Sequence, residues 1–358
     1  MRVLHFITSL EVGGAQRVLL ERLNQFVKNG ECLADHYIVY LRDGAFRKQI
    51  EAAGFKTKNI MGASWKASIS VFRLIFLIKQ FKPEVIHSSL WLANLIARWC
   101  GWVCHVPVIC DMHANFSHHG ALRNFIDRLP HPLPKKFVAV AGGVAQSFRK
   151  NITEKMWHSR LGKKAWSRCC VIENGIDPTP FVFSQENRKR VRKRLGIEDA
   201  TFVVGAVGRL VSVKRYDVLI DAFKVLCRKY EKSRLLIVGD GPLRPELERQ
   251  SRVGLLQEKI SFLGHRSDVA DLYSAFDCLA ICSQSEGLSI AYLEALVSGV
   301  PIIVSSADVE VLVKKMVFYF LIYNQKKFFA RKAKLFSQNM ITYGAGEFHK
   351  LYDEILQD

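Results

Sequence analysis

Residues 202–229 read FVVGAVGRLVSVKRYDVLIDAFKVLCRK, and this stretch decides the fold. Its first six residues are apolar and rich in valine, as in a strand that is buried on both faces. A glycine then opens a loop, and from Tyr216 the apolar residues recur with the three- and four-residue spacing of an amphipathic helix. A buried strand, a loop and a helix in this order are typical of the strand–helix–strand unit of a parallel sheet.

The same alternation of short apolar strands and longer amphipathic segments runs through the rest of the chain. It is interrupted at residues 171–183, which contain an Asn-Gly turn, two prolines and no periodicity, as a linker does. The sequence therefore predicts an α/β protein of two Rossmann-like, doubly wound parallel-sheet domains that face a central cleft. We expect an N-terminal domain over residues 1–178, a second domain over 179–340, and a C-terminal helix over 341–358 that packs back on the first. The predicted strands are 2–8, 36–41, 55–60, 84–87, 106–110, 137–141, 202–207, 234–238, 260–263, 277–281 and 302–305.

The chain carries a strong positive charge that is unevenly distributed. Its 358 residues hold 52 Lys and Arg against 33 Asp and Glu, a formal net charge of +19. Residues 1–183 alone hold 25 basic and 12 acidic side chains. Such a field attracts nucleic acid, anionic lipid or a phosphorylated substrate, or it is a solvated face without a partner. Because no helix-turn-helix, RNP or zinc-finger signature accompanies the charge, we expect no nucleic-acid partner.

Cysteine usage and the apolar runs bear on the compartment. The nine cysteines form no CxxC pair, which favours reduced thiols in a reducing compartment. The apolar run after Arg2 is too short for a secretory signal, and no apolar stretch reaches the ~20 residues of a membrane-spanning helix. We therefore expect a cytoplasmic protein that lies, at most, on the inner face of a membrane.

Glycine-containing loops follow several predicted strands. Gly13 and Gly14 precede a helix, whose free N–H groups and positive dipole end suit a phosphate or a sugar. A double glycine is equally an ordinary tight turn. Gly239 and Gly241 stand in a similar loop, which suits close packing against a nucleotide or, again, a plain turn.

Four charged side chains stand at defined spacings in the second domain. Arg209 and Lys214 lie five positions apart in one loop, where two cations can neutralise a departing diphosphate or simply face solvent. Glu286 and Glu294 stand eight positions apart around a helix start, at which Gly287 frees backbone amides. Glu286 could bind sugar hydroxyls and Glu294 vicinal ribose hydroxyls. Helix physics alone instead favours a capped amphipathic helix with Glu294 facing water.

Taken in order, these motifs resemble the retaining glycosyltransferases of family 4, the group 1 transferases, which have the two-domain GT-B fold. The resemblance spans approximately residues 2–305 and is strongest in the second domain. Its last motif matches the E-x7-E pattern of the family together with the trailing Gly299 and Pro301. In this combination and order the motifs are highly specific. They are GGAQRVLLERL (13–23), VIHSSLWLANLIAR (85–98), VIENGID (171–177), VGRLVSVKRYDVLIDAF (207–223), LLIVGDGPLRPELE (235–248), ISFLGHRSDV (260–269) and SEGLSIAYLEALVSGVPII (285–303).

The resemblance implies a role for each matching residue. Arg209 and Lys214 fall on the diphosphate-binding pair, and Glu294 on the residue that binds the donor ribose. Glu286 falls on the carboxylate that contacts the transferred sugar, and His113 looks like the active-site histidine near that sugar. Catalytic roles are thus expected for His113, Glu286, Arg209 and Lys214. The expected donor-binding residues are Gly14, Arg209, Lys214, Gly239, Gly241, Glu286, Gly287, Leu288, Ser289 and Glu294, and the expected acceptor-binding residues are Gly13, Gln16 and Asn94.

The resemblance also implies the reaction. A hexose-type sugar would pass from a nucleotide-diphosphate sugar, with UDP-sugar favoured over GDP-sugar, and the anomeric configuration would be retained. No carboxylate is well placed as the nucleophile of a double displacement, so we favour a front-face route in which the leaving phosphate accepts the acceptor proton. Because the chain contains no Asp-x-Asp triplet, we expect no divalent metal and no cofactor.

The acceptor is expected to be a glycan or a lipid-linked molecule in bacterial surface polysaccharide synthesis, such as lipopolysaccharide or capsule. The basic first domain and the apolar segment Ile69–Ile78 suit docking on an anionic membrane, although a buried helix with basic flanks explains this segment equally well. Two alternatives stay open. One is a GT-B sugar-nucleotide epimerase. The other is a nucleotide-sugar-binding protein with impaired catalysis, because the sequence departs from the family pattern after Ser305.

Overall fold

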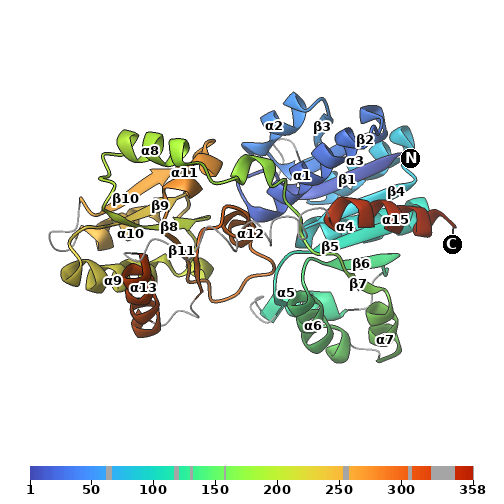
Figure 1. Cartoon of the computed structure of the whole chain (residues 1–358). Coiled ribbons are helices and arrows are strands. Elements are labelled where there is room, and N and C mark those ends of the chain that lie inside the picture. The colour runs from blue at the N-terminus through green and yellow to red at the C-terminus, as the bar shows by residue number, and fades with distance from the viewer. Residues whose placement is uncertain are drawn as a thin grey trace. The chain divides into compact units, whose positions relative to one another are not determined.

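The chain divides into two compact units in the computed structural model, which describes residues 1–61, 67–116, 121–129, 132–156, 159–252, 258–304, 309–323 and 343–357. The first unit is made of Met1–Gly175 and Thr342–Asp358, and the second of Ile176–Ile341. Each is built on one parallel sheet with helices on both faces (Figure 1). The predicted fold class of two doubly wound α/β domains is thereby confirmed.

A seven-stranded sheet forms the first unit, in the order β3-β2-β1-β4-β5-β6-β7. The order runs one way from β1 to β3 and the other way from β4 to β7, so the topological switch point lies between β1 and β4. The strands are β1 (Val3–Ser9), β2 (His36–Arg42), β3 (Lys56–Asn59), β4 (Val85–Ser89), β5 (Val108–Met112), β6 (Lys136–Ala139) and β7 (Cys169–Val171). The α-helices are α1 (Gly14–Lys28), α2 (Phe46–Ala52), α3 (Ala67–Phe81), α4 (Trp91–Cys104), α5 (Ala121–Arg128), α6 (Gly142–Asn151), α7 (Ser159–Ser167) and α15 (Tyr343–Gln357).

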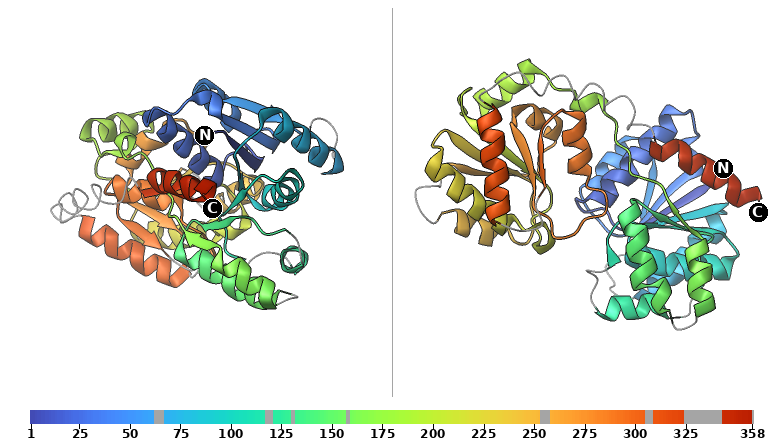
Figure 2. Two further views of the ribbon diagram at one scale, coloured as in Figure 1. Left: turned by 90° about the vertical axis from the view of Figure 1, so that its right-hand side faces the viewer. Right: turned by 60° about the horizontal axis from the view of Figure 1, so that its bottom comes forward.

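Side chains of this sheet alternate between its two faces, so that each face has a core of its own. On one face Leu4 and Phe6 of β1 pack with buried residues of α3, α4 and α6. On the other face Val3 and Ile7 pack with α1, α2 and α15. The helix α15 thus returns from the end of the chain to cover the N-terminal sheet beside α1 (Figure 2).

A five-stranded sheet forms the second unit, in the order β10-β9-β8-β11-β12, and its switch point lies between β8 and β11. One face packs against α9, α10 and α13, and the other against α8, α11 and α12. The strands are β8 (Phe202–Val207), β9 (Ser233–Val238), β10 (Ile260–Gly264), β11 (Cys278–Ile281) and β12 (Ile302–Val304). The α-helices are α8 (Gln185–Arg194), α9 (Tyr216–Lys229), α10 (Arg244–Ser251), α11 (Val269–Ala275), α12 (Ile290–Val297) and α13 (Val309–Tyr323).

The structure differs from the sequence-based expectation at a few elements. The edge strand β7 was not expected, because its three residues are only partly buried or exposed and show no clear alternation. The helix expected from Leu288 begins at Ile290. The departure from the family pattern after Ser305 begins outside the described residues, and α13 follows from Val309. Within the described part of the chain, no helix combines the length and the apolar character needed to cross a bilayer.

Candidate functional site

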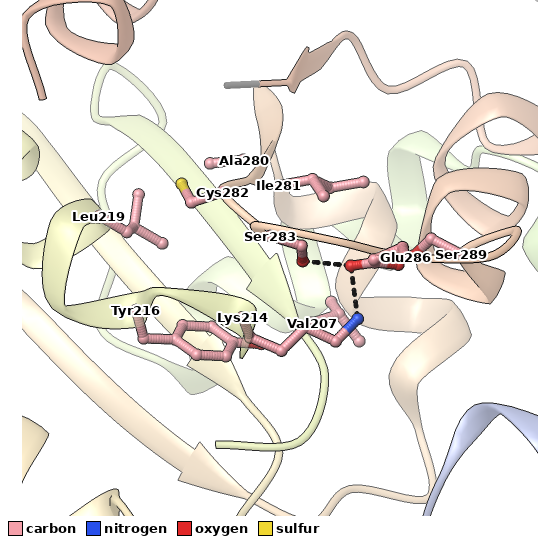
Figure 3. A pocket seen from close by; sticks show the side chains of 10 residues that line it. All are labelled: Val207, Lys214, Tyr216, Leu219, Ala280, Ile281, Cys282, Ser283, Glu286 and Ser289. Carbon is pink, nitrogen blue, oxygen red and sulfur yellow. Dashed lines mark hydrogen bonds and ion pairs between the residues drawn. The ribbon is translucent and has the colours of Figure 1, made fainter. Parts of the chain in front are cut away.

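A small pocket lies at the carboxyl ends of β8 and β11 in the second unit (Figure 3). These two strands are neighbours at the point where the strand order reverses. Open α/β sheets bind ligands at this point, because the loops that leave the two strands diverge there. The lining residues come from both strand ends, their loops and α9, and they are Val207, Lys214, Tyr216, Leu219, Ala280, Ile281, Cys282, Ser283, Glu286 and Ser289.

An ion pair between Lys214 and Glu286 supplies the charge of the pocket. Lys214 Nζ lies 2.5 Å from Glu286 Oε1, and the Ser283 hydroxyl donates a hydrogen bond to the same oxygen (Figure 3). Burial by itself raises the pKa of the Glu286 carboxyl, but the Lys214 charge and hydrogen bonds from Lys214, Ser283 and Ser289 outweigh it, and the pKa is lowered. Glu286 is therefore an acceptor-only carboxylate at neutral pH, and it stands beside an ammonium group that can bind an anion.

A backbone hydrogen bond joins the two charged loops. The N–H of Gln284, in the loop after β11, donates to the carbonyl of Val213 at 2.8 Å. Val213 belongs to the short 3-10 turn Ser212–Lys214, so this contact fixes the residue next to Lys214. This bond joins the loop that carries Lys214 to the loop that carries Glu286.

Gly239 and Gly241 allow a third loop to pack beneath the Arg209 loop. Gly239 has a φ of +128°, and a Cβ there would lie 2.0 Å from the carbonyl oxygen of Gly208. A Cβ on Gly241 would lie 2.5 Å from the carbonyl oxygen of Leu210. Both glycines are therefore required for backbone-to-backbone packing inside the protein, a cause that the sequence alone did not distinguish from ligand contact.

Glu294 is buried in α12, where the Tyr273 hydroxyl donates to its Oε2 at 2.8 Å. The expectation from helix physics alone, that Glu294 faces water, is wrong, because that face of α12 packs against α11. Of the sequence-predicted donor residues, the structure brings Lys214, Glu286 and Ser289 together around the pocket. Gly287 and Leu288 lie in the connecting loop, Glu294 lies one helical turn beyond Ile290, and Arg209 is exposed in the loop after β8.

The candidates of the first unit follow its three central strands. Gly13 and Gly14 follow β1, Asn94 lies in α4 after β4, and His113 directly follows β5. Strands β1, β4 and β5 are neighbours, and the switch point lies between the first two of them. These residues therefore all lie at the carboxyl ends of the central strands. His113 and Gly14 belong to the first unit, whereas Glu286, Arg209 and Lys214 belong to the second.

Two predicted acceptor-binding residues have internal partners. The Gln16 side chain is buried, and its Nε2 donates to the carbonyl of Ser9 at 2.8 Å. Asn94 Nδ2 donates to the carbonyl of Asp111 at 2.8 Å, and the Ser88 hydroxyl donates to Asn94 Oδ1 at 2.8 Å. Both amides therefore tie the ends of the central strands to the helices that follow.

Sequence reasoning missed a buried charged cluster beneath His113. Asp111, two residues earlier in β5, is 1% exposed, and its Oδ2 lies 2.9 Å from Arg22 Nη2 and 3.7 Å from His113 Nε2. The available signal was a carboxylate inside the apolar run VICDM (108–112). A charge in a buried strand requires a partner, but the sequence does not say which residue supplies it.

Two family models cover most of the chain, and with them the class of protein is defined. Residues 12–179 match the model described as Glycosyltransferase Family 4, and residues 187–335 match the model described as Glycosyl transferases group 1. A putative glycosyltransferase of Bacillus subtilis, EpsF, is 30% identical over 314 residues, which is 86% of this chain and 80% of that protein. The chain therefore belongs to the family 4, group 1 glycosyltransferases, as the sequence motifs indicated.

Other curated relatives are also similar to this chain, but the similarity spans only part of their length. The alpha-monoglucosyldiacylglycerol synthase of Acholeplasma laidlawii is 25% identical over 268 residues, 68% of this chain and 66% of that enzyme. The matched segments span 52% to 66% of the length of three curated relatives. Among solved structures, that of Anabaena HepE in complex with UDP and glucose covers 100% of both chains, with a TM-score of 0.82 and 18% identity, and shows the same fold.

Proposed function

We propose that this protein transfers a hexose-type sugar from a nucleotide-diphosphate sugar, with UDP-sugar favoured, to a glycan or lipid-linked acceptor, and that the anomeric configuration is retained. The observation that carries the proposal is the Lys214–Glu286 pair in a pocket at the switch point of the second sheet. An ammonium group suits the diphosphate, and a carboxylate suits the hydroxyls of the sugar next to it. Family membership and the UDP and glucose bound to the HepE structure support the same substrate class.

Lys214 and Arg209 take the charge that develops as the donor bond breaks. The bond between the anomeric carbon and the diphosphate oxygen breaks, and the acceptor oxygen bonds to that carbon on the same face. The acceptor proton passes to the departing phosphate oxygen. Two cations stabilise the diphosphate at this moment, so the proposed route needs no divalent metal. Glu286 accepts hydrogen bonds from the sugar and Glu294 holds the ribose, and the family resemblance assigns His113 a contact with the sugar as well.

A nucleotide panel tests the donor class. We expect UDP to raise the melting temperature, with GDP as the next candidate, while ADP, CMP and NAD leave it unchanged. A ligand that binds only the folded state stabilises it by about 2.7 kcal/mol at one hundred times its dissociation constant, which a thermal melt detects readily. The shift should persist in EDTA, because the proposed site uses Lys214 and Arg209 in place of a metal.

This panel, together with a turnover assay of the UDP-sugar with and without an acceptor, separates the alternatives. If none of the five nucleotides raised the melting temperature, a nucleotide-sugar site in the second unit would be contradicted. Stabilisation by UDP without transfer of sugar to any glycan or lipid acceptor would instead identify a nucleotide-sugar-binding protein. Conversion of the UDP-sugar to an epimer without an acceptor would identify an epimerase.

An exposed, mixed apolar and basic face of α3 supports an anionic membrane as the place where the acceptor is met. Leu74, Leu77 and Ile78 of α3 are buried in the first unit, whereas Phe72 and Phe76 are 73% and 68% exposed. Arg73 and Lys79 are exposed on the same helix. Aromatic rings beside basic residues on one helix favour the interface of an anionic bilayer. The likeness to an alpha-monoglucosyldiacylglycerol synthase agrees with this site of action.

Vesicle binding tests the membrane face. We expect Phe72→Ser with Phe76→Ser to weaken binding to phosphatidylglycerol vesicles by at least about tenfold, because burial of one phenylalanine side chain contributes about 1.5–3 kcal/mol. Co-flotation with vesicles measures the change. Phe318→Ser is a matched control, since Phe318 is 58% exposed on α13 in the second unit. Equal loss in both variants, or none in either, would contradict docking through α3.

A further inference from the structure

A cluster of buried polar side chains lies on the face of the first sheet that α1 and α15 cover. His87 of β4 and Asp111 of β5 are each 1% exposed, and Arg22 of α1 is 5% exposed. In the register of β4 and β5, His87 stands opposite Ile109 and Ser89 opposite Asp111, so alternate residues bring these side chains to one face. Buried charges are costly unless they are paired and hydrogen-bonded, so each contact within this cluster has a physical cause.

Asp111 is the centre of the cluster. Its Oδ2 accepts hydrogen bonds from Arg22 Nη2 at 2.9 Å and from the Ser89 hydroxyl at 3.1 Å, and its Oδ1 lies 2.7 Å from His87 Nε2. Burial by itself raises the pKa of the Asp111 carboxyl, but the neighbouring Arg22 and His87 outweigh it and hold that pKa well below its usual value. Asp111 is thus a fixed carboxylate that can only accept hydrogen bonds.

The C-terminal helix completes the cluster from the far end of the chain. The Tyr352 hydroxyl of α15 lies 2.5 Å from His87 Nδ1, and the Phe348 ring lies 3.8 Å from the guanidinium carbon of Arg22. Because Asp111 only accepts, we infer that His87 carries its proton on Nε2, which leaves Nδ1 to accept from Tyr352. Arg22 Nη1 also lies beside this ring, 3.0 Å from Nε2 and 3.2 Å from Nδ1. The hydrogen bonds therefore run in one direction, from Tyr352 to His87 to Asp111.

His113 stands at the other end of this chain of contacts. Its Nε2 is buried without a hydrogen-bond partner among the described residues, and it lies 3.7 Å from Asp111 Oδ2. A carboxylate at that distance attracts a hydrogen on Nε2. The second ring nitrogen, Nδ1, is then left without a hydrogen and acts as an acceptor.

We propose that Asp111, fixed by Arg22, His87 and Tyr352, is a positioning residue that sets the tautomer and orientation of His113, so that His113 accepts a hydrogen bond from a hydroxyl of the bound sugar. This inference rests on the proposed function, in which His113 contacts the sugar. It gives α15 a role in the chemistry of the first unit in addition to covering its sheet. A partner that orients the imidazole from behind is a general means of fixing which nitrogen faces a substrate.

Nitrogen NMR of the His113 ring tests the tautomer without any substrate. In the wild-type protein we expect the His113 ring to carry its hydrogen on Nε2 at neutral pH. Tyr352→Phe removes one hydroxyl and keeps the ring, and we expect it to leave His113 in a mixture of tautomers. It should also lower kcat by about 3- to 10-fold, the worth of a single hydrogen bond, with an unchanged KM for the nucleotide sugar.

Ile355→Val is the matched control, because Ile355 is a buried residue of the same helix and is not part of the cluster. It weakens the packing of α15 without touching His87, so the tautomer and kcat should both stay as in the wild type. An Nδ1–H tautomer in the wild-type protein would overturn the inference even if Tyr352→Phe failed to fold. Equal kcat and tautomer in Tyr352→Phe and wild type would also overturn it. Absence of UDP binding would overturn the proposed function instead, since the tautomer is measured without a ligand.

Discussion

Replacement of Glu286 by glutamine is expected to slow sugar transfer without weakening the binding of UDP. Sugar transfer should fall by about 10- to 100-fold, because a hydrogen bond to a charged group is worth about 1.5–3 kcal/mol and the sugar would be left with a neutral amide oxygen in place of the carboxylate. The affinity for free UDP should stay the same or rise. In the free protein Lys214 is already paired with Glu286 at 2.5 Å, and a diphosphate must compete with that carboxylate for the ammonium group. Initial rates with the UDP-sugar and calorimetric titration with UDP measure the two quantities.

Two further variants test whether Glu286 contacts the sugar. Glu246→Gln, at an exposed position of α10 in the same unit, removes the same charge away from the pocket and should change neither quantity. Lys214→Ala with Arg209→Ala should weaken both donor and UDP binding, because these side chains are proposed to hold the diphosphate itself. If Glu286→Gln weakened UDP binding as much as it slowed transfer, Glu286 would be supporting the loop through Ser283 rather than contacting the sugar.

The parts of the fold that the sequence predicted are those that depend on neighbours along the chain. Residues 202–229 form β8, a loop and α9, because a buried strand and an amphipathic helix each have a local periodicity. Strand β7 was missed because it does not depend on neighbours along the chain. It is a three-residue edge strand that exists because Phe137 of β6 pairs with Cys169, and that partner lies outside its own sequence neighbourhood.

The site shows the same division between local and long-range causes. The motif around Glu286 was visible in the sequence, and the structure places Glu286 beside Lys214, 72 positions earlier. The burial of Glu294 was not visible, since it depends on Tyr273 of the neighbouring helix. The cluster around Asp111 was hidden entirely, because His87, Arg22 and Tyr352 reach it through strand order and through the return of α15.

Replacement of Asp277 by asparagine is expected to destabilise the second unit by about 3–5 kcal/mol, the cost of breaking a buried ion pair. Asp277 precedes β11 and is 9% exposed. Its two oxygens lie 2.6 Å from Arg188 Nη2 and 2.7 Å from Arg192 Nη2, and the N–H of Val203 in β8 donates to it at 2.7 Å. The side chain of Arg192 is 1% exposed, so its guanidinium would stay buried without a counter-charge. One carboxylate thus joins the helix α8 to the strands β8 and β11. These two strands carry the pocket.

The tryptophans make this effect measurable in the whole chain. All six lie between residues 65 and 166, so their fluorescence follows the first unit, whereas far-ultraviolet circular dichroism follows both. In urea, Asp277→Asn should shift the part of the dichroism transition that belongs to the second unit to lower denaturant and leave the fluorescence transition in place. Asp271→Asn is the matched control, because Asp271 of α11 pairs with Arg190 of α8 at the surface. The side chain of Asp271 is 31% exposed and that of Arg190 is 59% exposed. An exposed ion pair of this kind contributes about 0.2–1 kcal/mol to stability. Asp277→Asn should therefore lower the free energy of unfolding several-fold more than Asp271→Asn does. Equal shifts of the dichroism transition in the two variants would show that burial of the Asp277 pair does not stabilise the unit.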